Sequence, residues 1–136
     1  MLHRELGSIA HSLESNEGIR FESCTFDEAL KKAEQSGKLV FMDCYTSWCD
    51  PCRMMANQVF TQPAVGDYFN KHFVNLKMDM EKGEGKTLAT RYAVSAYPTL
   101  LILDAEGNVL KKIVGAQLAQ ELLQKANVSS IQGIKK

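Results

Sequence analysis

The segment KLVFMDCYT, residues 38–46, restricts the fold more than any other part of the chain. It is almost continuously apolar over the length of one strand, and this pattern is typical of a central strand that helices cover on both faces. Only Asp43 interrupts it. The sequence therefore predicts an α/β domain with a buried sheet and one carboxylate placed inside that sheet.

The segments on either side fit one mixed sheet. A β-type stretch at 19–22 precedes a helix that begins with a capping box from Thr25 to Glu28 and ends at Gly37. The alternating segment FVNLKMDME predicts a strand whose polar face includes Asn75 and Lys77. The remaining patterns predict helices from the CDPC turn to about 59, from 63 to about 69, from the EKGEGK turn to about 92 and at 116–126, and a hairpin that turns at 105–108.

One domain is expected from 136 residues of which 45% are hydrophobic. We expect this domain at 19–126, preceded by a helical N-terminal extension at 1–18 and followed by a loose tail at 127–136. Sixteen basic and 16 acidic residues cancel, which argues against nucleic acid or anionic lipid as a partner. No apolar run approaches the roughly 20 residues of a membrane span, so no integral span is expected.

The segment SWCDPCRMM places Cys49 and Cys52 three residues apart at the expected start of a helix. This spacing puts their Cα atoms roughly 5 to 6 Å apart, within the range that a disulfide needs. If Cys49 lies at the helix N-terminus, the free amides and the helix dipole favour its thiolate. Cys49 is then the attacking nucleophile, and Cys52, one turn inside and better shielded, is the resolving thiol.

The two residues between the cysteines affect this chemistry differently. Pro51 loses only an amide that has no helical partner at this position, and it stiffens the turn between the sulfurs. Asp50 disfavours a second negative charge beside Cys49 and so stabilises the disulfide relative to the dithiolate. Our hypothesis is a reducing pair, which the substitution Asp50→Gly would make more oxidising.

Asp43 is the second informative residue, because a carboxylate in an apolar strand is unfavourable unless it is paired. Burial raises its pKa toward the range in which it exchanges protons near neutrality, so it could take the proton of Cys52, directly or through water. Lys77 is the expected counter-charge. The alternative is an aspartate that only caps or hydrogen-bonds nearby backbone.

The other cysteines and the histidines give no pattern typical of a metal site. Zinc sites need a second Cys pair or suitably spaced histidines, and neither is present, so we expect no metal. Cys44 is expected to be a buried inert thiol, too far along the strand to pair with Cys49. Cys24 precedes a helix and has no evident partner.

Three segments, FMDCYTSWCDPCRMM, VNLKMD and AYPTLLILDAEGNV, together resemble the thioredoxin-fold family. More narrowly, they are similar to thioredoxin-like domains of bacterial envelope thiol-disulfide oxidoreductases, including the C-terminal domain of the membrane electron transporter that supplies reducing equivalents to the periplasm. The resemblance covers about residues 20–126. It implies a thioredoxin fold, a central mixed β-sheet flanked by helices.

The resemblance also implies roles for individual residues. The family's nucleophile matches Cys49, its resolving cysteine Cys52 and its motif tryptophan Trp48. Its buried acid and accompanying lysine match Asp43 and Lys77. Its cis-proline matches Pro98, where a cis bond would expose the Tyr97 backbone to an extended peptide near Cys49. The chain departs from the thioredoxin pattern at Asp50, where glycine is usual, and in a longer EKGEGK segment. The residues expected to contact substrate are Trp48, Asp50, Pro51, Tyr97 and Pro98.

We therefore expect an enzyme, a thiol-disulfide oxidoreductase that reduces protein disulfides with electrons from an upstream thiol donor. The dithiol itself carries the electrons, so no dissociable cofactor is expected. A disulfide isomerase or oxidase using the same cysteines is the first alternative, and a non-enzymatic module that binds protein segments beside Pro98 is the second. We expect a monomer in the bacterial periplasm or cell envelope, with the cytoplasm as the alternative location.

Overall fold

A four-stranded sheet in the order β2-β1-β3-β4 forms the centre of the computed structural model, which describes residues 18–134. β1 (Leu39–Tyr45) pairs in parallel with β2 (Phe73–Asp79) and antiparallel with β3 (Thr99–Leu103). β4 (Val109–Val114) lies antiparallel to β3 at the far edge. The expected mixed sheet, with the apolar segment as its central strand, is confirmed.

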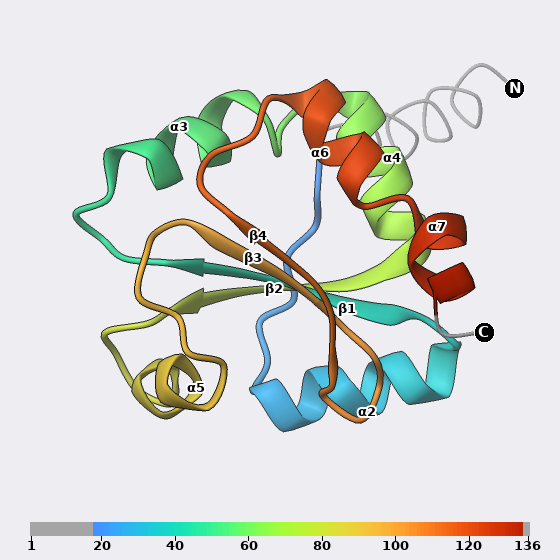
Figure 1. The fold of residues 1–136 in the computed structure, drawn as a ribbon, viewed down its shortest axis with the longest axis horizontal. Helices are drawn as coiled ribbons and strands as arrows, with labels where there is room; N and C mark the ends of the chain where they lie inside the picture. Colours follow the sequence, from blue (N-terminus) through green and yellow to red (C-terminus); the bar gives the residue numbers. More distant parts are fainter. Residues whose placement is uncertain (1–17, 135–136) are drawn as a thin grey trace, which may run out of the picture.

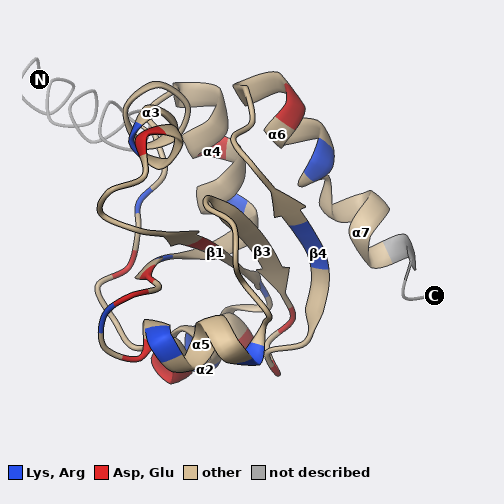
Figure 2. Cartoon of the chain, turned by 60° about the vertical axis from the view of Figure 1, so that its left-hand side comes forward, with Lys and Arg blue, Asp and Glu red and all other residues tan. Residues whose placement is uncertain are grey.

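Helices cover both faces of this sheet (Figure 1). α3 (Asp50–Gln58), α4 (Pro63–His72) and α6 (Ala119–Lys125) lie on one face. α2 (Phe26–Ser36) and α5 (Gly85–Arg91) lie on the other. Acidic and basic residues are interspersed over these helices and the loops between them (Figure 2). Within residues 18–134, none of the helices combines the length and the apolar character that a bilayer crossing requires.

The sheet separates two apolar clusters, because successive side chains of a strand point to opposite faces. Phe41 of β1 belongs to the cluster beneath α3, α4 and α6, whereas Met42 and Cys44 belong to the cluster beneath α2 and α5. Asp43 follows the alternation of Phe41 and so faces the side of the sheet that α3 covers. The strand pattern thus decides which helix the buried carboxylate can reach.

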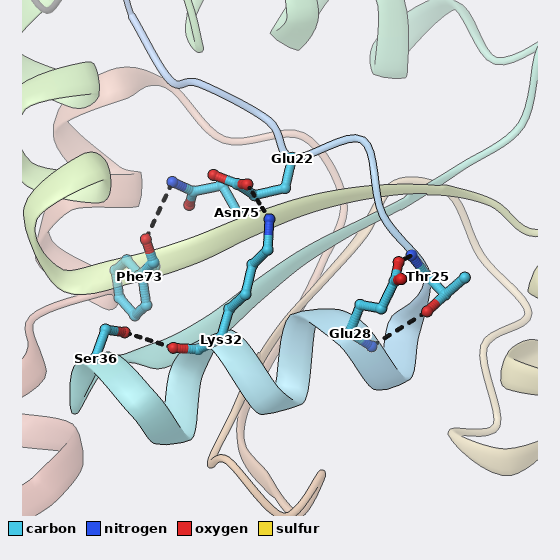
Figure 3. A network of polar contacts seen from close by, with 7 residues as sticks. All are labelled: Glu22, Thr25, Glu28, Lys32, Ser36, Phe73 and Asn75. Carbon is cyan, nitrogen blue, oxygen red and sulfur yellow. Dashed lines mark hydrogen bonds and ion pairs between the residues drawn. The ribbon is translucent and has the colours of Figure 1, made fainter.

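Local sequence signals explain how α2 begins and ends. The Glu28 amide donates to the Thr25 hydroxyl at 3.1 Å, and the Thr25 amide donates to the Glu28 carboxylate at 2.8 Å, which completes the predicted capping box (Figure 3). Gly37 ends the helix with a left-handed φ of 71°, a conformation that suits glycine. Both expected boundaries of this helix are confirmed.

Asn75, which the sequence places on the polar face of β2, is only 2% exposed. The incoming chain lies beside β2, where Phe21 forms an isolated parallel bridge with Asn75. The expected β-type stretch at 19–22 is reduced to this bridge. The side-chain amide of Asn75 donates a hydrogen bond to the Phe69 carbonyl at 3.2 Å, and this bond joins α4 to β2.

The C-terminal segment is helical where a loose tail was expected at 127–136. α7 (Val128–Ile134) buries Ile131 to 3% exposure. The Tyr68 hydroxyl of α4 donates to the Ala126 carbonyl at 2.9 Å and accepts from the Val128 amide at 2.7 Å, which fixes the turn before α7. The expected helix at 1–18 falls almost wholly outside the described residues, and the domain boundaries stay a prediction.

Candidate active site

Cys49 and Cys52 form a disulfide at the N-terminus of α3, with their Cα atoms 5.2 Å apart. Cys49 is the N-cap residue and Cys52 lies in the first helical turn. Pro51 also lies in this turn, where its missing amide breaks no helical hydrogen bond. The pair therefore has the spacing and the position that the sequence predicts.

The Cys49 sulfur accepts a hydrogen bond from the Cys52 amide at 3.1 Å. In the reduced protein the same amide and the dipole of α3 would stabilise a thiolate on Cys49. The expected greater shielding of Cys52 is wrong, because Cys49 is 3% and Cys52 6% exposed. The N-cap geometry turns the Cys49 sulfur back over the first turn, so hydrogen bonding and not exposure distinguishes the two cysteines.

Arg53 forms an ion pair with Asp50, the charged residue between the two cysteines. The Asp50 carboxylate in this pair is exposed, and the Arg53 guanidinium also donates a hydrogen bond to the Ser47 carbonyl at 2.8 Å. The Asp50 charge that we expected to act on Cys49 is therefore partly balanced by a cation one helical turn away. This ion pair was not anticipated, although an aspartate and an arginine three residues apart on a helix are a recognisable sequence signal.

Asp43 is 2% exposed, and burial raises the pKa of its carboxyl group to about 7, while the positive charge of Lys77 opposes the rise. The two residues are register partners in the parallel pair β1 and β2. The Lys77 ammonium lies 5.0 Å from the centre of the Tyr45 ring and 5.6 Å from that of Phe21. Among the described ion pairs none joins Lys77 to Asp43, so the expected counter-charge acts from a distance.

A cavity of about 200 Å³ joins Asp43 to the cysteine pair, because Asp43 and Cys52 both line it. Lys77 and Thr46 line the same cavity. The Thr46 hydroxyl and one Asp43 carboxylate oxygen are buried, and neither has a hydrogen-bond partner among the described protein groups. The sequence-based interpretation missed Thr46, although a hydroxyl three residues before Cys49, at the exit of an apolar strand, was a visible signal.

An aromatic surface lies beside the disulfide. Trp48 is 62% exposed, and its indole NH donates to the Glu81 carboxylate at 3.0 Å. The Trp48 ring meets the Tyr97 ring edge-on, with ring centres 6.0 Å apart. The Tyr97–Pro98 peptide bond is cis, as the resemblance implied. The role of Glu81 was not expected, because Glu81 is far from Trp48 in the sequence.

The remaining thiols lie away from the disulfide. Cys44 is fully buried on the opposite face of the sheet, and burial strongly raises the pKa of its thiol. Cys24 is half-buried, and burial raises its thiol pKa as well. Neither thiol has the environment of a reactive nucleophile. Within residues 18–134 no group of three or more His, Cys, Asp or Glu side chains is arranged to hold a metal ion.

A model of the family described as "Thioredoxin-like domain" matches residues 26–128. Thioredoxin H1 of Arabidopsis thaliana is 38% identical over 93 residues, which cover 68% of this chain and 75% of that protein.

Solved structures show the same likeness. The solution structure of a candidate disulphide-isomerase from Bacteroides thetaiotaomicron is 53% identical in sequence and has a TM-score of 0.75. The match covers 84% of this chain and 94% of that chain. The oxidised C-terminal domain of DsbD from Neisseria meningitidis is 20% identical with a TM-score of 0.62, over 78% of this chain and 94% of that one, and shows the shared fold alone.

Proposed function

Because this chain belongs to the thioredoxin-like family and is a thiol-disulfide oxidoreductase, we propose that it works as a reductase of protein disulfides. The Cys49 thiolate attacks one sulfur of a substrate disulfide, forms a mixed disulfide and releases the other substrate sulfur as a thiolate. Cys52 then attacks the Cys49 sulfur, which releases the second substrate thiolate and leaves the disulfide of the structure. The substrate gains two electrons, the protein loses two, and no dissociable cofactor is needed.

The observation that carries this proposal is the hydrogen bond from the Cys52 amide to the Cys49 sulfur at the N-terminus of α3. It gives Cys49 the environment of an attacking thiolate. Cys52 shares a cavity with Asp43, whose pKa near 7 suits a group that accepts the Cys52 proton at neutral pH. Lys77, the register partner of Asp43, limits the rise of that pKa.

We assign substrate contact to the residues around the disulfide. The exposed Trp48, which Glu81 holds in place, offers an apolar surface to a bound polypeptide. Tyr97 packs against that indole and supports it. Extended peptides commonly bind such surfaces through their backbone and one or two side chains. The proposed contact residues are Trp48, Asp50, Pro51, Tyr97 and Pro98.

The partners of this reaction are protein disulfides and an upstream thiol donor that returns the pair to the dithiol. We propose a monomer in the periplasm or cell envelope of a bacterium, with the cytoplasm as the alternative. The envelope assignment rests on the sequence resemblance, and the 53% identity to a Bacteroides protein supports a bacterial source. Fractionation of cells with periplasmic and cytoplasmic marker enzymes would separate the two locations.

The decisive measurement is the redox equilibrium of Cys49 and Cys52 in dithiothreitol or glutathione buffers. A midpoint potential at or below about −250 mV identifies a reductase, because the reduction potential of thioredoxin is about −270 mV. The variant Asp50→Gly should give a more oxidising midpoint, by a small margin because Arg53 already balances part of the Asp50 charge. An unchanged or more reducing midpoint in this variant would contradict the role of Asp50.

A disulfide isomerase is the second candidate, because the Bacteroides protein described as a candidate disulphide-isomerase is 53% identical. A midpoint between roughly −120 and −180 mV would favour an isomerase or an oxidase over a reductase. Recovery of activity from scrambled ribonuclease would then identify the isomerase.

A binding module without turnover is tested by two cysteine variants. Cys49→Ser should abolish turnover in the enzyme, whereas a module would keep its binding unchanged and have no turnover to lose. Cys52→Ala should trap a mixed disulfide at Cys49 that is visible by mass spectrometry. A variant that traps none would count against the enzymatic mechanism.

A further inference from the structure

Thr46 is a buried polar residue that directly follows β1 and lies three residues before Cys49. It is 1% exposed, and its Oγ1 atom has no hydrogen-bond partner among the described protein groups. Buried hydroxyl groups are almost always paired with protein or with ordered water. Asp43 Oδ1 is in the same situation, and both residues line the cavity that reaches Cys52.

The cavity is large enough for ordered water. Its volume is about 200 Å³, whereas one water molecule occupies roughly 30 Å³ in the liquid. An ionised Asp43 accepts hydrogen bonds only, while a threonine hydroxyl both donates and accepts. Thr46 is therefore suited to orient a water molecule toward a carboxylate.

We propose that the Thr46 hydroxyl positions a water molecule between the Asp43 carboxylate and the Cys52 sulfur, and so governs the proton transfer that activates the resolving thiol. The inference rests on the proposed function and deepens it. Within the mixed disulfide, the Cys52 thiol gives its proton to the water, which passes a proton to Asp43. The Cys52 thiolate then bonds to the Cys49 sulfur, and the bond from Cys49 to the substrate sulfur breaks. The substrate sulfur leaves as a thiolate, and the electrons balance.

Several groups set the pH at which this transfer operates. Asp43 faces Lys77 on β2, and Tyr45, Cys52 and Arg53 line the same cavity. Burial raises the pKa of Asp43 to about 7, so its protonation changes near neutral pH. A hydrogen bond from Thr46, direct or through the water, favours the ionised carboxylate. Loss of the hydroxyl should therefore raise the pKa of Asp43 further and move the pH profile of resolution upward.

The test is stopped-flow reaction of the reduced protein with 5,5′-dithiobis(2-nitrobenzoate), followed by release of the yellow thiolate. The first, bimolecular phase reports attack by Cys49, and the second, unimolecular phase reports resolution by Cys52. Thr46→Val removes the hydroxyl with little change of shape, and Thr46→Ser restores it. The readout is the second-phase rate between pH 5 and 9. Circular dichroism shows which variants are folded, and Thr46→Ala replaces the valine variant if that variant is unfolded.

We expect Thr46→Val to slow the second phase by about tenfold at pH 7, the effect of one lost hydrogen bond, and to raise its pH midpoint. Thr46→Ser should stay within about twofold of the unmodified protein. Thr46→Val should add nothing in an Asp43→Asn background, because both residues act on one transfer.

Three results would overturn the inference: an unchanged second phase in Thr46→Val, equal slowing in Thr46→Ser, or multiplying effects of the two substitutions. Lack of any second phase in the unmodified protein would instead refute the proposed function, and this inference with it.

Discussion

Replacing Asp43 with asparagine should stabilise the oxidised protein increasingly as the pH rises. The pKa of this carboxyl group is near its ordinary 3.8 in an unfolded chain and is raised to about 7 in the folded one, chiefly by burial. Below pH 3.8 the carboxyl group is protonated in both states, so it does not make stability depend on pH. Between pH 3.8 and about 7 the folded state keeps a proton that the unfolded chain releases, and above about 7 the folded state buries the charged carboxylate.

The size of the effect follows from this pKa difference. One pKa unit corresponds to about 1.4 kcal/mol, so the ionised carboxylate costs the folded state at most about 4 kcal/mol above pH 7. The advantage of Asp43→Asn should therefore grow by about 2.5 kcal/mol between pH 5 and pH 8 and then level off. A buried asparagine amide brings its own cost, but that cost does not change with pH.

Urea unfolding of the two oxidised proteins at several pH values measures this advantage, provided that the m-values agree. All other titrating groups are common to both proteins and cancel in the difference. Asp67→Asn is the matched control, because it makes the same substitution at an exposed position. An advantage of Asp43→Asn that stays constant from pH 5 to pH 8 would refute the assignment of a buried, high-pKa carboxylate.

Two further predictions concern the free thiols and the C-terminal helix. In the oxidised folded protein iodoacetamide should modify the half-buried Cys24 slowly and leave the fully buried Cys44 unmodified. Equal labelling of both thiols in a peptide map would contradict this difference in burial. Ile131→Ala should lower the free energy of unfolding by about 2 to 4 kcal/mol, because Ile131 is 3% exposed in the cluster that includes α6. The exposed neighbour Gln132 provides the control Gln132→Ala, and a loss below about 0.5 kcal/mol for Ile131→Ala would mean that α7 is not packed on the domain.

Local signals made much of this molecule predictable. The central strand follows from one apolar run, α2 from the capping box at Thr25, and the disulfide from the spacing of Cys49 and Cys52. In each case the determining residues lie within about one strand or one helix of each other. Such patterns can be interpreted from the sequence because the geometry of a single helix or strand brings the determining residues together.

Contacts between distant segments were not predictable in the same way. Asn75 lies on the side of β2 that alternation assigns to polar residues, yet Phe21 and α4 cover it. Lys77 was expected as the counter-charge of Asp43 and is its register partner, but its ammonium lies over the rings of Tyr45 and Phe21. Glu81 reaches Trp48 across 33 residues of sequence. Such contacts depend on how separate elements pack, which one-dimensional periodicity does not encode.

The position of Trp48 makes the protein its own optical reporter. The chain contains one tryptophan, and that residue adjoins Cys49 with 62% of its surface exposed. Indole emission, excited at the long-wavelength edge where tyrosine does not absorb, therefore arises from the redox centre alone. Changes in emission intensity or wavelength follow the state of one site, without an attached dye and without background from elsewhere in the chain.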